Sequence, residues 1–215
     1  MVELFTSQGC SSCPPADELL GELALRRNVI ALAFHVDYWD STGWRDPFAI
    51  AQSVTRQRGY VQMLGLSSAF TPQVIIDGRQ SFVGSDRRRI IAALNEQGPK
   101  IPITANAALG VLTVMISGSD PASVADVVAI PYRDQASTTV GRGENAGRRL
   151  TEYNIVRQLR RLGAWDGRAS VLRIPVQSFP ADATRVAILL QRLPQGPVIG
   201  SAVADLRQAG TAVAE

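Results

Sequence analysis

Residues 2–17 read VELFTSQGCSSCPPAD, and this stretch decides the fold class. A short apolar strand at its start leads into a polar turn that holds the chain's two cysteines, Cys10 and Cys13. Pro14 and Pro15 then open a helix, because proline is tolerated in the first helical turn, where its missing N–H is not needed. A single Cys-x-x-Cys between a strand and a helix indicates redox chemistry rather than a disulfide scaffold.

The residues that follow alternate between strand and helix. The apolar run at 29–35 is typical of a strand buried on both faces of a parallel sheet, and the 3.6-residue period of 49–64 predicts a helix. Together these patterns predict the order β-α-β-α-β-β-α over residues 1–99. The expected strands are residues 2–5, 29–35, 73–78 and 81–84, and the expected helices are residues 14–24, 49–64 and 86–97.

From Ile101 onwards the pattern changes. Apolar residues alternate with polar ones at 112–116, 172–177 and 186–191, which indicates strands with one buried face. One helix is predicted among them, beginning at Thr151 and ending near residue 163. We therefore expect an α/β chain in which a β-α-β-α-β-β-α domain at residues 1–99 is followed by a β-rich, sandwich-like domain with one helix at residues 100–215.

The composition excludes several classes of protein. Hydrophobic residues make up 46% and charged residues 19%, so the chain can bury a sizeable core and is not mainly disordered. No run approaches about 18 uninterrupted apolar residues, so we expect no membrane-spanning segment. The formal net charge is +3 and Lys100 is the only lysine. We read the excess of arginine as a feature of composition and expect no nucleic-acid partner. The oligomeric state is not indicated.

The N-terminal residues give no sign of a signal peptide, because residues 1–5 lack a charged segment followed by a long apolar one. The sequence leaves open both a cytoplasmic location and the removal of an earlier leader.

The two cysteines are the first candidates for catalysis. We expect Cys10 at the exposed edge of the helix start, where free backbone N–H groups favour a thiolate. The two-residue spacer lets Cys13 reach Cys10 and resolve a mixed disulfide. Two alternatives remain open. One is a structural disulfide in a non-catalytic binding module, and the other is a copper or zinc site formed by Cys10, Cys13 and His35. No cofactor is expected.

Two further pairs of residues are expected beside the cysteines. Thr71-Pro72 precedes the third strand, and a cis bond there would present the Thr71 backbone to a peptide as an added strand. A trans proline that begins an edge strand is the alternative. His35 and Asp37 end the second strand at the sheet edge that also holds Cys10, so either could move a thiol proton. A histidine satisfied inside the core is the other interpretation of His35.

Residues 141–149 form a glycine-rich segment, GRGENAGRR. Its glycine spacing does not fit the dinucleotide-binding pattern, and it lacks the lysine of a P-loop. The segment could form an anion-binding loop, a clamp against the first domain, or a hairpin loop whose charges pair locally.

These features together resemble the thioredoxin superfamily. Residues 3–17 resemble, more closely, a family of bacterial proteins that are usually exported and have a thioredoxin-like fold. Because that family has no established activity, the functional expectations come from the superfamily. The chain departs from thioredoxin itself in lacking a tryptophan before Cys10 and in having Ser11 and Ser12 between the cysteines. The other stretches that fit the same family are residues 35–40, 43–44, 60, 71–73, 84–86 and 142–148.

The resemblance implies a role for three residues. Cys10 corresponds to the nucleophile, Cys13 to the resolving thiol and Pro72 to the substrate-facing cis proline. It also implies a protein thiol or disulfide as the partner, and a periplasmic or secreted location.

Overall fold

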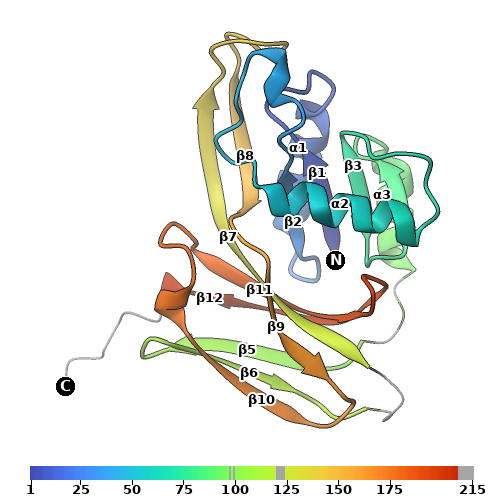
Figure 1. The fold of residues 1–215 in the computed structure, drawn as a ribbon, viewed down its shortest axis with the longest axis vertical. Coiled ribbons are helices and arrows are strands. Elements are labelled where there is room, and N and C mark those ends of the chain that lie inside the picture. The colour runs from blue at the N-terminus through green and yellow to red at the C-terminus, as the bar shows by residue number, and fades with distance from the viewer. Residues whose placement is uncertain (97, 99, 120–123, 208–215) are drawn as a thin grey trace. The chain divides into compact units, whose positions relative to one another are not determined.

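The computed structural model describes residues 1–96, 98, 100–119 and 124–207 (Figure 1). The chain divides into two compact units: Met1–Gln97 with Asp134–Val156, and Gly98–Arg133 with Arg157–Glu215. The sequence places its domain boundary at position 99, which lies outside the described residues, and assigns residues 134–156 to the second domain. In the structure these residues belong to the first unit, because a strand formed by them pairs with that unit's sheet.

The first unit follows the order predicted from the sequence, β-α-β-α-β-β-α, and adds a strand from the second half of the chain. Its sheet has the thioredoxin-like arrangement, with β2 parallel to β1 and β8, and β3 antiparallel to β1 and β4. The strand order is β8-β2-β1-β3-β4, and residues 134–139 of β7 lie beyond β8. The elements are β1 (Val2–Thr6), α1 (Pro14–Ala24), β2 (Ala31–His35), α2 (Ala51–Met63), β3 (Gln73–Ile76), β4 (Gln80–Val83), α3 (Arg87–Asn95), the end of β7 (Ala125–Thr139) and β8 (Arg149–Val156).

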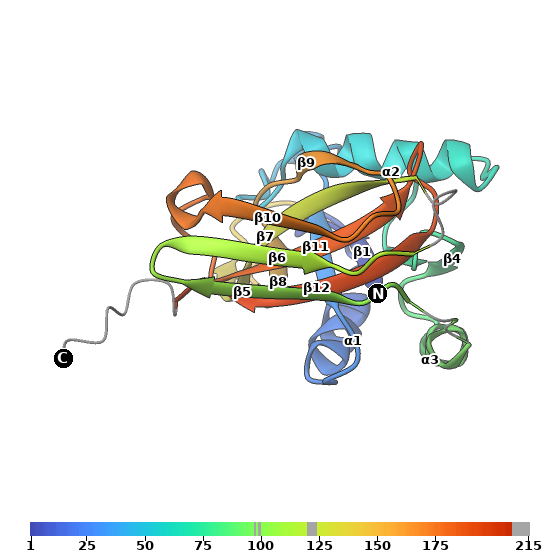
Figure 2. The same ribbon diagram turned by 90° about the horizontal axis from the view of Figure 1, so that it is seen from below.

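The alternation of side chains along β1 gives the sheet two buried faces. Val2 and Leu4 join a core cluster with the apolar residues of α1 and α3. Glu3 and Phe5 point to the opposite face, where the Phe5 ring meets the Tyr60 ring of α2 with centroids 6.3 Å apart. Figure 2 shows α2 on one side of this sheet and α1 and α3 on the other. This packing fixes the position of the turn between β1 and α1.

The second unit is rich in β-strands, as its alternating sequence predicts. One sheet has the order β10-β6-β5, and the other has the order β12-β11-β7, with β9 also paired to β7. Apolar residues of both sheets form one core cluster, which makes the unit sandwich-like. Its strands are β5 (Ile103–Ala108), β6 (Val111–Ile116), residues 125–133 of β7, β9 (Arg160–Trp165), β10 (Ser170–Pro175), β11 (Arg185–Arg192) and β12 (Val198–Asp205).

The helix predicted from Thr151 to residue 163 is wrong. The segment forms most of β8 and most of β9 instead. Leu150 and Glu152 are both buried and alternate with more exposed neighbours, so the period is two. A buried glutamate hides this alternation, because a charged residue is normally counted as solvent-facing. Among the described residues, none of the helices is long and apolar enough to cross a membrane.

Candidate functional site

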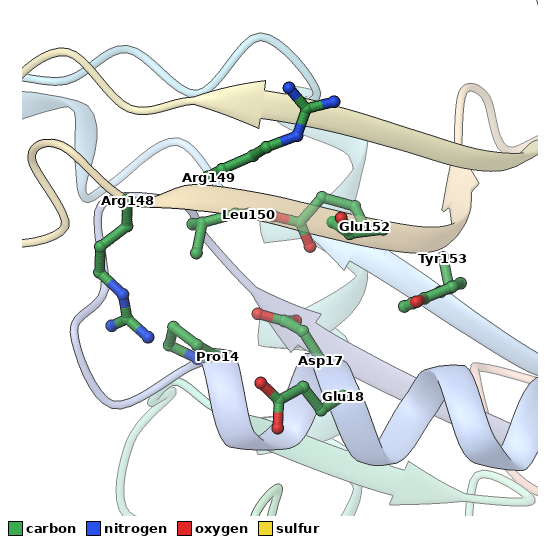
Figure 3. Close-up of a pocket in the computed structure, with 9 residues that line it drawn as sticks. Pro14, Asp17, Glu18, Arg148, Arg149, Leu150, Glu152 and Tyr153 are labelled. Carbon is green, nitrogen blue, oxygen red and sulfur yellow. The ribbon is translucent and has the colours of Figure 1, made fainter.

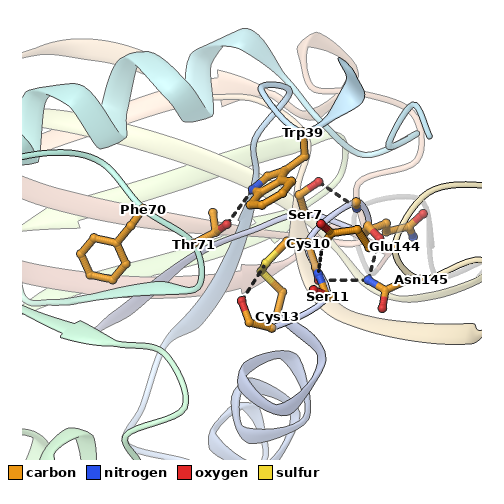
Figure 4. The surroundings of a disulfide bond; sticks show 12 residues. Ser7, Cys10, Ser11, Cys13, Trp39, Phe70, Thr71, Glu144 and Asn145 are labelled. Carbon is orange, nitrogen blue, oxygen red and sulfur yellow. Dashed lines mark hydrogen bonds between the residues drawn. A yellow bond between two sulfur atoms is a disulfide. The ribbon is translucent and has the colours of Figure 1, made fainter. Parts of the chain in front are cut away.

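The two cysteines form a disulfide that closes the turn between β1 and α1 (Figure 4). Their Cα atoms are 5.4 Å apart. Cys13 is the residue that caps α1, and Pro14 and Pro15 occupy the first two helical positions. Proline lacks an N–H, so the first backbone N–H groups of the helix are those of Ala16 and Asp17. Both donate to the carbonyl of Cys13, at 2.8 and 3.1 Å.

The amides of both cysteines also donate to carbonyl oxygens rather than to sulfur. Cys10 N donates to the Ser7 carbonyl at 3.1 Å, and Cys13 N donates to the Cys10 carbonyl at 3.2 Å. The Ser12 hydroxyl lies next to a sulfur, with its Oγ 3.4 Å from Cys10 Sγ. The sequence predicts stabilisation of a thiolate by free N–H groups of the helix. In the structure a side-chain hydroxyl is the donor best placed for this.

Both cysteines are fully buried, with 0% of each residue exposed, whereas Ser11 and Ser12 between them are exposed. The expectation of an exposed Cys10 is therefore wrong for the disulfide form. The loop after β2 lies beside the disulfide (Figure 4). Trp39 Nε1 donates to the Thr71 hydroxyl at 2.7 Å. A Cβ added at Gly9, directly before Cys10, would lie 3.0 Å from Trp39 Cβ. Trp39 thus links the cysteine turn to Thr71, and Figure 4 shows both residues around the disulfide.

The peptide bond between Thr71 and Pro72 is cis. Pro72 packs close to the start of α1, because a Cβ added at Gly84 would lie 2.8 Å from Pro72 Cβ and 2.9 Å from Ala16 Cβ. The Pro72 carbonyl also accepts a hydrogen bond from Gly84 N at 2.9 Å. The structure therefore brings Thr71 and Pro72 to the side of the cysteine turn, which is where the sequence analysis expects them.

The loop of residues 141–148 also reaches the cysteine turn, within the first unit. Asn145 is buried, and its Nδ2 donates to the carbonyls of Gln8 and Cys10, at 2.9 Å each. Glu144 is exposed, and its Oε2 accepts a hydrogen bond from Ser11 N at 3.1 Å. Of the three interpretations offered by the sequence, the clamp against the first part of the chain fits these contacts.

His35, the chain's single histidine, lies in a buried charge cluster with Asp46, Glu152 and Asp17. His35 Nδ1 donates to Asp46 Oδ2 at 2.7 Å, and His35 Nε2 lies 3.9 Å from Glu152 Oε2. Among the described residues Nε2 has no hydrogen-bond partner. Asp46 Oδ2 also accepts from Gln8 N at 2.8 Å, which ties the cluster to the cysteine turn.

The members of this cluster shift one another's pKa. Burial alone would lower the pKa of His35, but the carboxylates of Asp46, Glu152 and Asp17 together outweigh it and raise that pKa to about 9. Burial likewise opposes the effect of His35 on Asp46, whose pKa is held below its ordinary value. Burial raises the pKa of Asp17 and of Glu152, and their proximity raises that of Asp17 further. The cluster therefore holds both a protonated imidazole and carboxyl groups that take up protons readily.

A cavity of about 240 Å³ lies between α1 and β8 and reaches this cluster (Figure 3). Asp17 and Glu18 approach it from the helix and Glu152 from the strand, while Arg148 points toward Pro14. The cavity thus connects the surface with two of the buried acids.

Sequence reasoning places some residues well and misses others. Asp37 is exposed at the end of β2, outside the charge cluster. Both ring nitrogens of His35 face carboxylates, and no group of three or more potential ligands that could hold a metal occurs in the described part of the chain. Asp46 and Glu152 are missed, because Asp46 lies in a loop and the charge of Glu152 hides the alternation of its strand.

Comparisons with known proteins are consistent with this fold. Residues 1–191 match the model of a family described as "Protein of unknown function (DUF1223)". A structural-genomics crystal structure of a protein from Agrobacterium tumefaciens is similar, with a TM-score of 0.83 and 30% sequence identity. The match covers 100% of this chain and 96% of that chain. No curated protein matches the chain.

Proposed function

The chain belongs to the DUF1223 family, and from that premise we propose that it is a thiol–disulfide oxidoreductase or redox carrier acting on a protein partner. The observation that carries the proposal is the position of the Cys10–Cys13 disulfide, in the turn between β1 and the start of α1. A Cys-x-x-Cys pair at a helix start is suited to thiol–disulfide exchange. We also propose that the first unit belongs to the thioredoxin superfamily.

The exchange moves two electrons between the chain and its partner. In the reduced protein, the Cys10 thiolate attacks one sulfur of the partner's disulfide and releases the other as a thiolate. Cys13 then loses its proton and attacks the sulfur of Cys10 in the mixed disulfide. The Cys10–Cys13 disulfide forms, and the partner leaves with both of its cysteines reduced. The reverse sequence oxidises a partner dithiol.

The buried charge cluster is the proposed acceptor of the Cys13 proton. The Asp46 carboxylate accepts from Gln8 N at 2.8 Å and so contacts the cysteine turn, and Asp17 lies in the first turn of α1, directly after Cys13. His35, next to Asp46, completes the relay. Asp17 and Glu152 also line the cavity described above, which gives protons a route to solvent. Of the two residues expected to move this proton, His35 lies in the cluster and Asp37 is exposed outside it, which favours His35.

The partner must reach a disulfide that is covered in this state. The hydrogen bond between Trp39 and Thr71 is the contact to be opened, because it joins the loop after β2 to the residue before Pro72. Once it opens, the Thr71 backbone offers hydrogen bonds to an extended segment of the partner, as in β-strand addition. Pro72 lies beside that segment.

We propose a periplasmic or secreted location. The disulfide is the supporting observation, because such bonds persist in oxidising compartments and are rare in the cytosol. The resemblance to an exported bacterial family points the same way.

One observation favours a second candidate, a non-catalytic binding module with a structural disulfide. The two cysteines are 0% exposed, whereas a catalytic thiol needs access to its partner. In this case the disulfide stabilises the turn, and the thioredoxin-like surface binds without exchange.

Covalent trapping distinguishes the two candidates. Cys13→Ser leaves Cys10 able to attack a partner disulfide but unable to release it, so mixed disulfides should accumulate in extracts of the source cells and disappear on addition of reductant. The matched control is Cys10→Ser, which retains the other cysteine.

The comparison between the two variants decides the matter. A set of adducts that depends on Cys10 supports exchange, with mass spectrometry identifying the partner cysteine. Equal trapping by both variants, or none by either, supports the structural disulfide.

A further inference from the structure

The 141–148 loop places a carboxylate on the segment between the two cysteines. Ser11 N donates to Glu144 Oε2 at 3.1 Å, a contact between residues 133 positions apart in the sequence. In a turn of this kind the amides of the intervening residues are natural donors to a thiolate on the first cysteine. Here the Ser11 amide points to a carboxylate instead. Figure 4 shows Glu144 and Asn145 reaching the turn from the side of the loop.

The loop is anchored firmly enough to keep this carboxylate in place. Asn145 Nδ2 donates to the Gln8 and Cys10 carbonyls, and Arg148 Nη1 donates to Asn145 Oδ1, each at 2.9 Å. Asn145 is 1% exposed, so its amide is committed to these carbonyls. Glu144 itself is exposed, and the side chain and then the amide of Ser11 hold its pKa below the ordinary value. It is therefore ionised at neutral pH.

An ionised carboxylate at this position opposes a second negative charge on Cys10. Reduction converts the disulfide to two thiols, with two electrons and two protons supplied by the redox buffer, and the Cys10 thiol then ionises to the attacking thiolate. Like charges disfavour that ionisation. The Ser12 hydroxyl, 3.4 Å from Cys10 Sγ, has the opposite effect because it can donate to the thiolate. We propose that Glu144 is a positioning residue that lowers the reduction potential of the Cys10–Cys13 disulfide. This inference rests on the redox function proposed above.

The test uses a substitution that removes the charge and keeps the hydrogen bond. Glu144→Gln retains a side-chain oxygen that can accept from Ser11 N. The wild-type chain and the variant are equilibrated with a series of glutathione or dithiothreitol redox buffers, and the free thiols are counted after alkylation. At a given buffer the variant should show a dithiol-to-disulfide ratio about three- to tenfold higher, which corresponds to a potential about 15 to 30 mV less negative. The pKa of its Cys10 thiol, from the pH dependence of alkylation, should be lower.

Two controls separate charge from general structural effects. Glu96→Gln removes an exposed carboxylate at the C-terminal end of α3 in the same unit and should leave the potential unchanged. The difference between wild type and Glu144→Gln should shrink as ionic strength rises, because salt screens exposed charges. A change in structure alone would not vary in this way.

The outcomes distinguish the inference from the function on which it rests. A wild-type disulfide that no buffer in the series reduces reversibly would remove both proposals. A reversible wild-type transition with an unchanged or more negative potential for Glu144→Gln would overturn the role of Glu144 and leave the redox function standing.

Discussion

At the scale of single residues, we expect the indole of Trp39, which lies beside the disulfide (Figure 4), to limit access to it. Its N–H donates to the Thr71 hydroxyl at 2.7 Å, and both cysteines are buried. Trp39→Phe keeps the aromatic bulk and removes the donor. We expect dithiothreitol to reduce the disulfide about 2- to 10-fold faster in this variant, the range given by the loss of one neutral hydrogen bond. The rate is measured by quenching with an alkylating reagent and counting thiols by mass spectrometry.

Trp165→Phe is the matched control, because its indole donates to the Arg168 carbonyl in the other unit and should not affect the rate. A Trp39→Phe rate equal to that of wild type would mean that this hydrogen bond does not limit access.

Some residues of the candidate site can be identified from the sequence, and others cannot. Cys10 and Cys13 are recognisable because their chemistry depends on local spacing, and Thr71 stands out as the residue before a proline that begins a strand. Glu144 and Trp39 lie in segments that the sequence marks, residues 141–149 and 35–40, but nothing in the sequence identifies these two residues as neighbours of the cysteines. Glu144 contacts Ser11, 133 residues away in the sequence, and Trp39 contacts Thr71, 32 residues away. Both contacts depend on the tertiary positions of the loops that carry these residues.

At the scale of elements, a buried charge cluster joins β2, the loop after it and β8. The pKa of His35 is raised from 6.5 to about 9, so the folded state binds its proton more tightly than the unfolded state. The resulting stability is fully present below pH 6.5 and is lost as the pH rises through about 9. This loss should amount to about 3 kcal/mol in the free energy of unfolding. Urea denaturation at a series of pH values between 6 and 10 measures it.

Asp17 and Glu152, whose pKa values are raised by burial, add a decline of the same sign that begins at lower pH. His35→Gln should remove the histidine's own part of the decline. Because His35 lowers the pKa values of Asp17 and Glu152, the part that comes from these two acids should move to higher pH in this variant. A wild-type free energy of unfolding that is constant or rises over this window would show that the pKa of His35 is not raised. The chain contains no other histidine, so its NMR titration gives an independent reading.

The strand β8 shows why part of the fold could not be predicted from the sequence. The strands of the first unit are marked by proline, glycine and continuous apolar runs, and they occur where these signals place them. β8 is not marked in this way. The charge of its buried Glu152 is opposed by His35 of β2, whose Nε2 lies 3.9 Å from Glu152 Oε2, so the residue is unfavourable in a strand until the tertiary structure exists.

At the scale of the whole molecule, the sequence predicts an α/β chain with a thioredoxin-like part and a β-rich part, and the structure has both. The assignment of residues 134–156 does not follow from the sequence. These residues come after strands that belong to the second unit, and what joins them to the first unit is a long-range pairing, such as that of Ala33 with Ile155. The 141–148 loop thereby reaches the cysteine turn, so the candidate site is built from two distant parts of the chain.

The central claim is that the Cys10–Cys13 disulfide is exchanged rather than merely structural. The most direct measurement is its reduction potential in the full-length chain, from the fraction of free thiols across glutathione and dithiothreitol redox buffers. The account predicts a reversible two-electron transition at a potential above about −300 mV, the level below which structural disulfides of secreted proteins typically lie. A disulfide that stays intact across that range, or that is reduced only when the protein unfolds, would contradict it.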